Sequence, residues 1–177
     1  MNFRDLTADE IECRVQSVKQ NGLVLLLYKN ARCDMNILDE TIGAENWQRE
    51  HYECKGNLFC RVGINVSEVG QNVSAPIGSI PNWVWKSDCG TESNTEAQKG
   101  EASDSFKRAC FNWGIGRELY TAPFTWIPAD KCNISQGKCY DKFEVEKIII
   151  ENKRITALAI WNTTKNVRAF VWQRDTK

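Results

Sequence analysis

The stretch KGEASDSFKRACFNWGIGRELY, residues 99–120, decides the expected fold class. At about 100° per residue its apolar side chains fall within an arc of roughly 60°, which predicts an amphipathic helix with one face in a core. That face consists of Ala102, Phe106, Ala109 and Trp113. The preceding SNTE, residues 93–96, has the form of a capping box, so Ser93 is the expected N-cap. Gly114 and Gly116 are expected to end the helix.

The same stretch is rich in basic side chains. They are Lys99, Lys107, Arg108 and Arg117. Lys107 and Arg108 lie roughly 130° from the centre of the apolar face, on opposite flanks of the helix. These cations either solvate the outer face of an ordinary helix or contact a polyanion. The helix pattern alone leaves both interpretations open.

The composition indicates a single globular domain, residues 1–177. Of the 177 residues, 42% are hydrophobic and 26% are charged, which is typical of globular proteins. No apolar run approaches the roughly 18 residues of a membrane span, and no secretion segment follows residues 1–5, so we expect a cytoplasmic protein with no membrane partner. The formal net charge is zero, but it is −3 in residues 1–60, −2 in 61–130 and +5 in 131–177. Any polyanion must therefore bind to local patches of charge.

The remaining pattern mixes helices and strands. TADE, residues 7–10, fits a capping box and predicts a first helix, and residues 31–43 predict a second one that ends at a glycine. Residues 67–82 have the composition of a loop. Strands are expected at residues 22–30, in a hairpin over 46–66 that turns at 55–57, at 83–90, in a hairpin over 142–161 that turns at 151–153, and at 167–174. The sequence therefore predicts an α+β fold.

Little in the sequence points to catalysis. The eight cysteines include no C-x-x-C pair, which favours reduced, buried thiols over a zinc site. No phosphate-binding loop is present, and the single histidine, His51, is more typical of a structural residue than of a base. We expect no enzyme activity, no cofactor and no metal. One alternative is a metal-dependent nuclease whose Mg²⁺ ligands would come from the acidic residues Asp88, Glu92, Glu101 and Asp104.

Two stretches resemble a known family. ARCDMNILDETIGAENW, residues 31–47, and the helix of residues 99–120 resemble the Rad52-type single-strand annealing proteins. The compact phage members, the Sak-type recombinases, are most similar, and they share the lead-in WVWKSDCGTESNTEAQKG of residues 83–100. The resemblance covers most of residues 5–125, which we take as the core. Residues 131–177 form a basic, β-rich C-terminal extension with no such resemblance.

The resemblance implies a β-β-β-α core, an antiparallel sheet packed on a long helix, to which this chain adds a C-terminal hairpin. It also implies a ring-type homo-oligomer that holds single-stranded DNA in an outer basic groove and anneals complementary strands without ATP. The groove residues carry over to Lys99, Lys107 and Arg108. Arg32 stands one position away from a further groove arginine, and Phe111 replaces another basic residue. Arg117 either binds phosphate or balances the negative end of the helix.

The expected function is therefore single-strand annealing in phage recombination and DNA repair, inside the bacterial host. A host single-strand binding protein or a host recombinase is an additional candidate partner, and the sequence does not decide between them. A DNA-end protection protein of the same fold is the main alternative. Trp47, Trp83, Trp85 and Trp113 are expected to pack in the core or between subunits, with base stacking as the alternative. The basic extension fits either a second DNA surface or the acidic N-terminal part of a neighbouring subunit.

Overall fold

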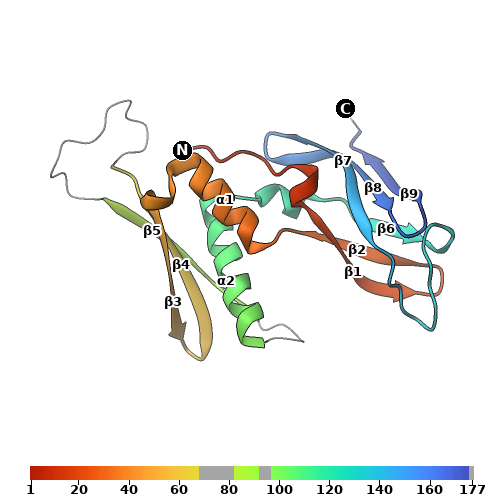
Figure 1. Ribbon diagram of the computed structural model, residues 1–177, viewed down its shortest axis with the longest axis horizontal. Coiled ribbons are helices and arrows are strands. Elements are labelled where there is room, and N and C mark those ends of the chain that lie inside the picture. Colours follow the sequence, from red (N-terminus) through yellow and green to blue (C-terminus); the bar gives the residue numbers. More distant parts are fainter. Residues whose placement is uncertain (68–81, 92–96, 176–177) are drawn as a thin grey trace. The chain divides into compact units, whose positions relative to one another are not determined.

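The computed structural model describes residues 1–67, 82–91 and 97–175 (Figure 1). It confirms a mixed α+β fold built on antiparallel sheets. The chain divides into two compact units. Unit 1 comprises Met1–Arg4 and Ala31–Gly116, and unit 2 comprises Asp5–Asn30 and Arg117–Lys177. No helix in the described ranges is long and apolar enough to cross a membrane.

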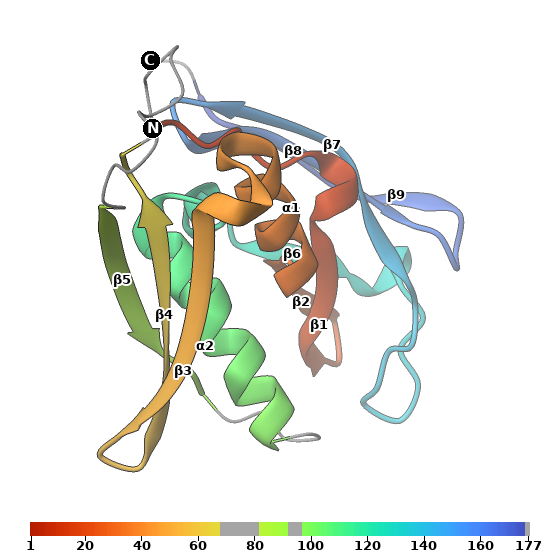
Figure 2. The ribbon, with the colours of Figure 1, turned by 60° about the vertical axis from the view of Figure 1, so that its left-hand side comes forward.

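Unit 1 is a three-stranded sheet with helices on one face (Figure 2). In chain order it contains α1 (Ala31–Ile42), η2 (Ala44–Asn46), β3 (Trp47–Cys54), β4 (Asn57–Asn65), β5 (Trp83–Cys89) and α2 (Ala97–Trp113). The strand order is β3-β4-β5, and α2 packs on β4 and β5. Cys60, Val62 and Ile64 alternate along β4 and are fully buried against this helix.

Local sequence accounts for the shape of unit 1. Lys55 and Gly56 both have positive φ, 53° and 76°, which suits the tight turn between β3 and β4. Gly114 ends α2 with φ 102°, as its sequence predicts. The last turn of α2 is capped from the sheet, because Lys86 Nζ of β5 donates a hydrogen bond to the Asn112 carbonyl at 2.9 Å. The predicted core face is confirmed at Phe106 and Ala109, both fully buried.

Unit 2 is a six-stranded antiparallel sheet. Its strands are β1 (Glu12–Lys19), β2 (Gly22–Tyr28), β6 (Thr125–Pro128), β7 (Phe143–Glu151), β8 (Arg154–Asn162) and β9 (Val167–Gln173), in the order β6-β2-β1-β7-β8-β9. The end strands β6 and β9 also contact each other, so the sheet curls strongly around its core. Short 3-10 turns complete the unit: η1 (Ala8–Glu10), η3 (Arg117–Thr121) and η4 (Ala129–Lys131).

The predicted first helix is wrong. The capping box at Thr7 and Glu10 is present, but it closes only the 3-10 turn η1. The next residues form β1, whose exposed and half-buried positions alternate along the strand and pair with β2. A capping box starts a longer helix only when apolar residues with helical spacing follow it. Here the side chains that follow alternate with a period of two residues, which is typical of a strand.

The other predicted elements are confirmed, namely β2, α1, the β3–β4 hairpin, β5, the β7–β8 hairpin and β9. The short strand β6 was not predicted. The compact units do not follow the chain order, since Asp5–Asn30 groups with Arg117–Lys177. The predicted cap at Ser93 and most of the predicted loop at 67–82 lie outside the described residues.

Candidate nucleic-acid interface

The helix α2 carries two adjacent cations with different surroundings, Lys107 and Arg108. Adjacent residues of an α-helix are about 100° apart, so the two side chains leave the helix in different directions. Arg108 reaches β5, where its guanidinium forms an ion pair with Asp88 at 3.3 Å. Asn112, one turn further along, donates to the Ser87 carbonyl of the same strand at 2.9 Å. This flank of α2 is therefore attached to the sheet.

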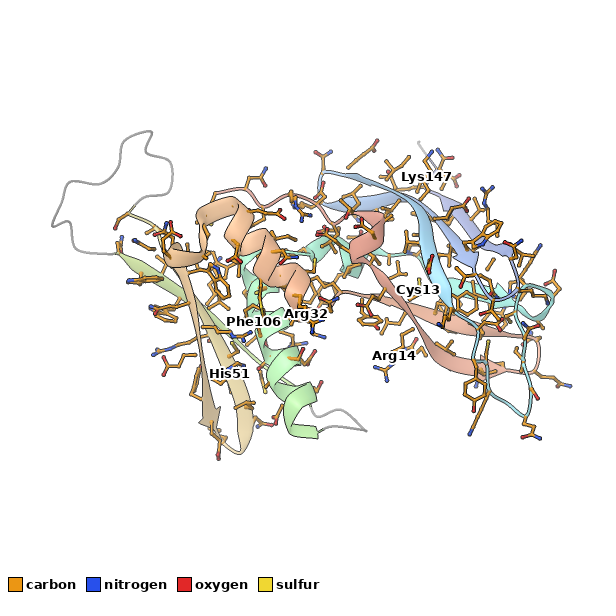
Figure 3. The ribbon with its side chains drawn as sticks, in the orientation of Figure 1. Cys13, Arg14, Arg32, His51, Phe106 and Lys147 are labelled. Carbon is orange, nitrogen blue, oxygen red and sulfur yellow. The ribbon has the colours of Figure 1, made fainter. Side chains whose placement is uncertain are left out.

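Lys107 lies on the other flank of α2. It forms no ion pair or hydrogen bond with the described part of the chain and is partly exposed. The preceding residue, Phe106, stacks on Trp47 of β3 with 6.0 Å between ring centroids. Its ring also lies beneath the guanidinium of Arg49, 4.7 Å from the centroid. An exposed arginine of β3 is thus held against α2, over the ring of Phe106, which Figure 3 labels.

Arg49 is a candidate that the sequence analysis missed. Register places Trp47, Arg49 and His51 on the helix-facing side of β3, opposite Ile64, Val62 and Cys60. His51 Nε2 lies 3.1 Å from the Ala102 carbonyl of α2, which agrees with a structural role for that histidine. The period-two alternation that puts Trp47 in the core would have placed Arg49 beside it.

The remaining predicted site residues are distributed over both units. Arg32 is exposed in the first turn of α1, and α1 packs against α2 in unit 1. Lys99 belongs to the first turn of α2, but its side chain lies outside the described residues. Arg117 is exposed at the start of η3 and belongs to unit 2. The structure therefore brings Lys107 and Arg108 onto one helix, with Arg32 on the helix packed against it.

The opposite face of the three-stranded sheet is aromatic and electrically balanced. Trp83 and Trp85 lie in contact on β5, with 6.2 Å between their ring centroids. The Trp85 ring covers Gly63 so closely that a Cβ atom added to this glycine would lie 2.8 Å from the ring. Arg61 lies 4.7 Å from the Trp85 centroid but is bound to Glu50 at 2.6 Å. Among the described residues, this face therefore offers no uncompensated guanidinium. Trp113, for its part, packs within unit 1, with Nε1 donating to the Val62 carbonyl at 3.0 Å.

The proposed Mg²⁺ ligands are engaged in structural hydrogen bonds. Asp88 accepts from the Cys89 N–H, Glu101 from the Leu58 N–H, and Asp104 from both the backbone and the hydroxyl of Thr91. No group of three metal-binding side chains occurs within residues 1–67, 82–91 and 97–175. Glu92 lies outside those ranges. The described carboxylates thus stabilise the junction of β4, β5 and α2.

Part of the charge of the C-terminal extension is balanced within the chain. Lys153 forms an ion pair with Asp5 at 2.8 Å, and Arg168 binds Glu146 through two hydrogen bonds. The hydrogen bonds from Arg168 lower the pKa of Glu146, and the carboxylate in turn raises the pKa of Arg168. These cations already have carboxylate partners in their own subunit.

The geometry described above can be set beside known proteins. The chain matches the Rad52/22 family of double-strand break repair proteins over residues 4–138. No curated protein and no solved structure matches it. The matched residues include both helices, the three strands of unit 1 and the cations at 32, 49, 107 and 108, and the match ends before β7. This covers well over half of the chain, which therefore belongs to the Rad52/22 family.

Proposed function

We propose that this protein binds single-stranded DNA and anneals complementary strands without ATP, as a ring-type homo-oligomer in phage recombination and repair. The observation that carries the proposal is the family match, because it spans the whole of α1, the three-stranded sheet and α2. The sheet followed by the long helix would be the β-β-β-α core of that family. No catalytic group is needed for such a function, since annealing requires only that two strands be held with their bases accessible.

The proposed contact surface is the flank of α2 that carries Lys107, together with Arg49 and Arg32. Lysine and arginine side chains that bind phosphates neutralise the DNA backbone and do not contact the base edges. The bases therefore stay free to pair. Lys99 extends the same helix and is proposed to contribute. Arg108 is proposed to contribute less than Lys107, because Asp88 already compensates its charge. For the same reason Arg61, bound to Glu50, is not part of the proposed surface.

A ring explains how a chain of zero net charge holds a polyanion. A few cations per subunit give only weak binding on their own. When identical subunits line one continuous strand, every further contact is intramolecular and the contacts reinforce one another. Oligomer formation and DNA affinity should therefore rise together with protein concentration.

The experiment follows binding and pairing in the same sample. One strand carries a donor dye and its complement an acceptor dye, and anisotropy and energy transfer are recorded without nucleotide, with and without Mg²⁺. Accelerated pairing supports annealing. Binding without faster pairing supports end protection, and Mg²⁺-dependent loss of full-length strands supports a nuclease. An absence of binding at low salt would contradict a DNA role altogether.

A further inference from the structure

The segment from Arg117 to Phe124 in unit 2 presents two aromatic rings to solvent. Tyr120 is 70% exposed and Phe124 is 75% exposed, although only three residues separate them. Large aromatic side chains normally bury most of their surface, and single exposed ones need no explanation. Two such rings in one short segment do require one.

The backbone that carries these rings is firmly anchored. Glu118 is fully buried and its Oε1 accepts a hydrogen bond from the Leu6 N–H at 2.8 Å. The Thr121 hydroxyl donates to the Glu118 carbonyl at 2.7 Å and accepts from the Ile155 N–H of β8 at 2.8 Å. Tyr120 lies between these two anchored residues. Its ring therefore stands on a rigid support, and little conformational entropy is lost when a ligand binds it.

Two exposed arginines lie on this segment or next to a residue bound to it. Arg117 begins the segment and is exposed, while the neighbouring carboxylate of Glu118 is withdrawn into the core. Arg154 is also exposed and directly precedes Ile155, the residue that is hydrogen-bonded to Thr121. Glu151 lies opposite Arg154 in the β7–β8 hairpin, but no ion pair joins the two within the described part of the chain.

We infer that Tyr120 and Phe124 form a stacking site for unpaired bases of single-stranded DNA, with Arg117 and Arg154 beside the phosphates. The inference rests on the proposed function and adds a second, base-contacting site to the phosphate-contacting flank of α2. Exposed aromatic rings combined with cations are the usual means by which proteins hold single strands of any sequence, since every base has a π-face. A stacking site distinguishes a single strand from a duplex, because duplex bases are already stacked on one another. The site would therefore release DNA once annealing is complete.

The test compares two DNA probes that share a phosphate backbone. One is a 30-nucleotide thymidine strand, and the other is an abasic strand of the same length, both measured by anisotropy at one salt concentration. The variant combines Tyr120→Ala with Phe124→Ala. The control is Tyr140→Ala, which removes a ring that is 82% exposed in the same unit but lies next to Asp141. Unfolding temperature and oligomeric mass are recorded for every variant.

We expect wild type and the control to prefer the thymidine strand, and the double variant to lose at least tenfold in affinity for it. Its affinity for the abasic strand should be unchanged. Tyr120→Phe should retain the wild-type preference, because only the ring is needed for stacking. Equal wild-type affinity for both probes would overturn the stacking site while leaving DNA binding intact. A double variant that loses both probes equally and changes its oligomeric mass would overturn it in favour of a contact between subunits. A wild type that binds neither probe contradicts the proposed function itself.

Discussion

Arg108 of α2 is bound to Asp88 of β5 across 3.3 Å, with 40% and 27% of the two side chains exposed. Lys107, the residue before it, has no such partner among the described residues. Two adjacent cations of one helix therefore differ in the charge that they can offer to a phosphate. This difference makes their contributions to DNA binding separable by experiment.

Lys107→Gln should weaken single-strand binding more than Arg108→Gln. Loss of a phosphate contact lowers the slope of log K against log salt by about 0.7 for single strands, so Lys107→Gln should show a drop of that size and Arg108→Gln a smaller one. Asp88→Asn should strengthen binding, because it releases the charge of Arg108 while retaining an acceptor for the Cys89 N–H. Salt titrations of all three variants provide the measurement. Equal slopes for Lys107→Gln and Arg108→Gln would place both residues on the DNA surface alike.

Arg49→Lys should bind single-stranded DNA less tightly than wild type although the charge is conserved. The planar guanidinium stacks over the Phe106 ring and is thereby oriented, whereas a lysine ammonium has no planar group to align. We expect a loss of a few-fold for Arg49→Lys and a larger loss for Arg49→Gln. Anisotropy titrations at one salt concentration test this order. Equal affinities for Arg49→Lys and wild type would show that the stack does not position the contact.

Trp113→Ala should destabilise the protein by about 3–5 kcal/mol, as expected for the deletion of a large packed aromatic side chain. The indole packs within unit 1, and its Nε1 donates a hydrogen bond to the Val62 carbonyl. Lys86 Nζ lies over the ring, 4.5 Å from its centroid. Trp113→Phe should cost less, because it retains an aromatic ring at that position. Urea unfolding provides the free energies. A Trp113→Ala variant that keeps its stability but loses DNA binding would instead identify a base-stacking residue.

Protonation of Asp141 should lower the stability of the fold at acid pH. Burial alone would raise the pKa of this carboxyl group, but hydrogen bonds from Asn162 and Asn133 outweigh it and hold the pKa below its ordinary value of 3.8. A carboxylate with a lowered native pKa stabilises the fold fully above its unfolded pKa and loses that contribution as the pH falls through the native value. Thermal unfolding should therefore show a fall in stability below about pH 4. Asp141→Asn should be less stable at pH 6 and show a smaller fall.

Buried thiols should resist alkylation in the native protein. Burial is the main cause that raises the pKa of Cys13 to about 12 and those of Cys60 and Cys132 to about 11, so little thiolate exists at pH 8. Cys54 is exposed at the end of β3 and should react first with iodoacetamide. Peptide mass spectrometry after timed labelling gives the order. Early labelling of Cys60 or Cys132 would contradict the packing of the core described for each unit.

Much of unit 1 could be predicted from the sequence, because its signals are local. The apolar stripe of α2, the Lys55-Gly56 turn and the glycine after α1 each act within a few residues. Less of unit 2 could be predicted, because β1 and β2 pair with strands that lie about a hundred residues or more further along the chain. No local pattern encodes such a pairing. The capping box at Thr7 was misleading for the same reason, as the strand register of β1 depends on its partners.

The candidate site was predicted only in part. Lys107 and Arg108 were proposed from a motif and from helix geometry, but the ion pair that distinguishes them was not foreseen, because Asp88 lies 20 residues away on another element. Arg49 was missed because an arginine in a strand is usually solvated. Only the contact with Phe106, 57 positions later in the sequence, gives it a fixed place beside α2.

The most direct test compares two double variants that each remove two positive charges from unit 1. Arg49→Gln with Lys107→Gln removes the charges of the proposed surface. Arg4→Gln with Arg61→Gln removes two that are bound to Glu40 and Glu50. Pairing of labelled complementary strands is followed without nucleotide. The account predicts that the first variant loses most of the acceleration while the second pairs strands like wild type. Equal losses would show that net charge alone matters, and an unimpaired first variant would remove the DNA surface from this flank of α2.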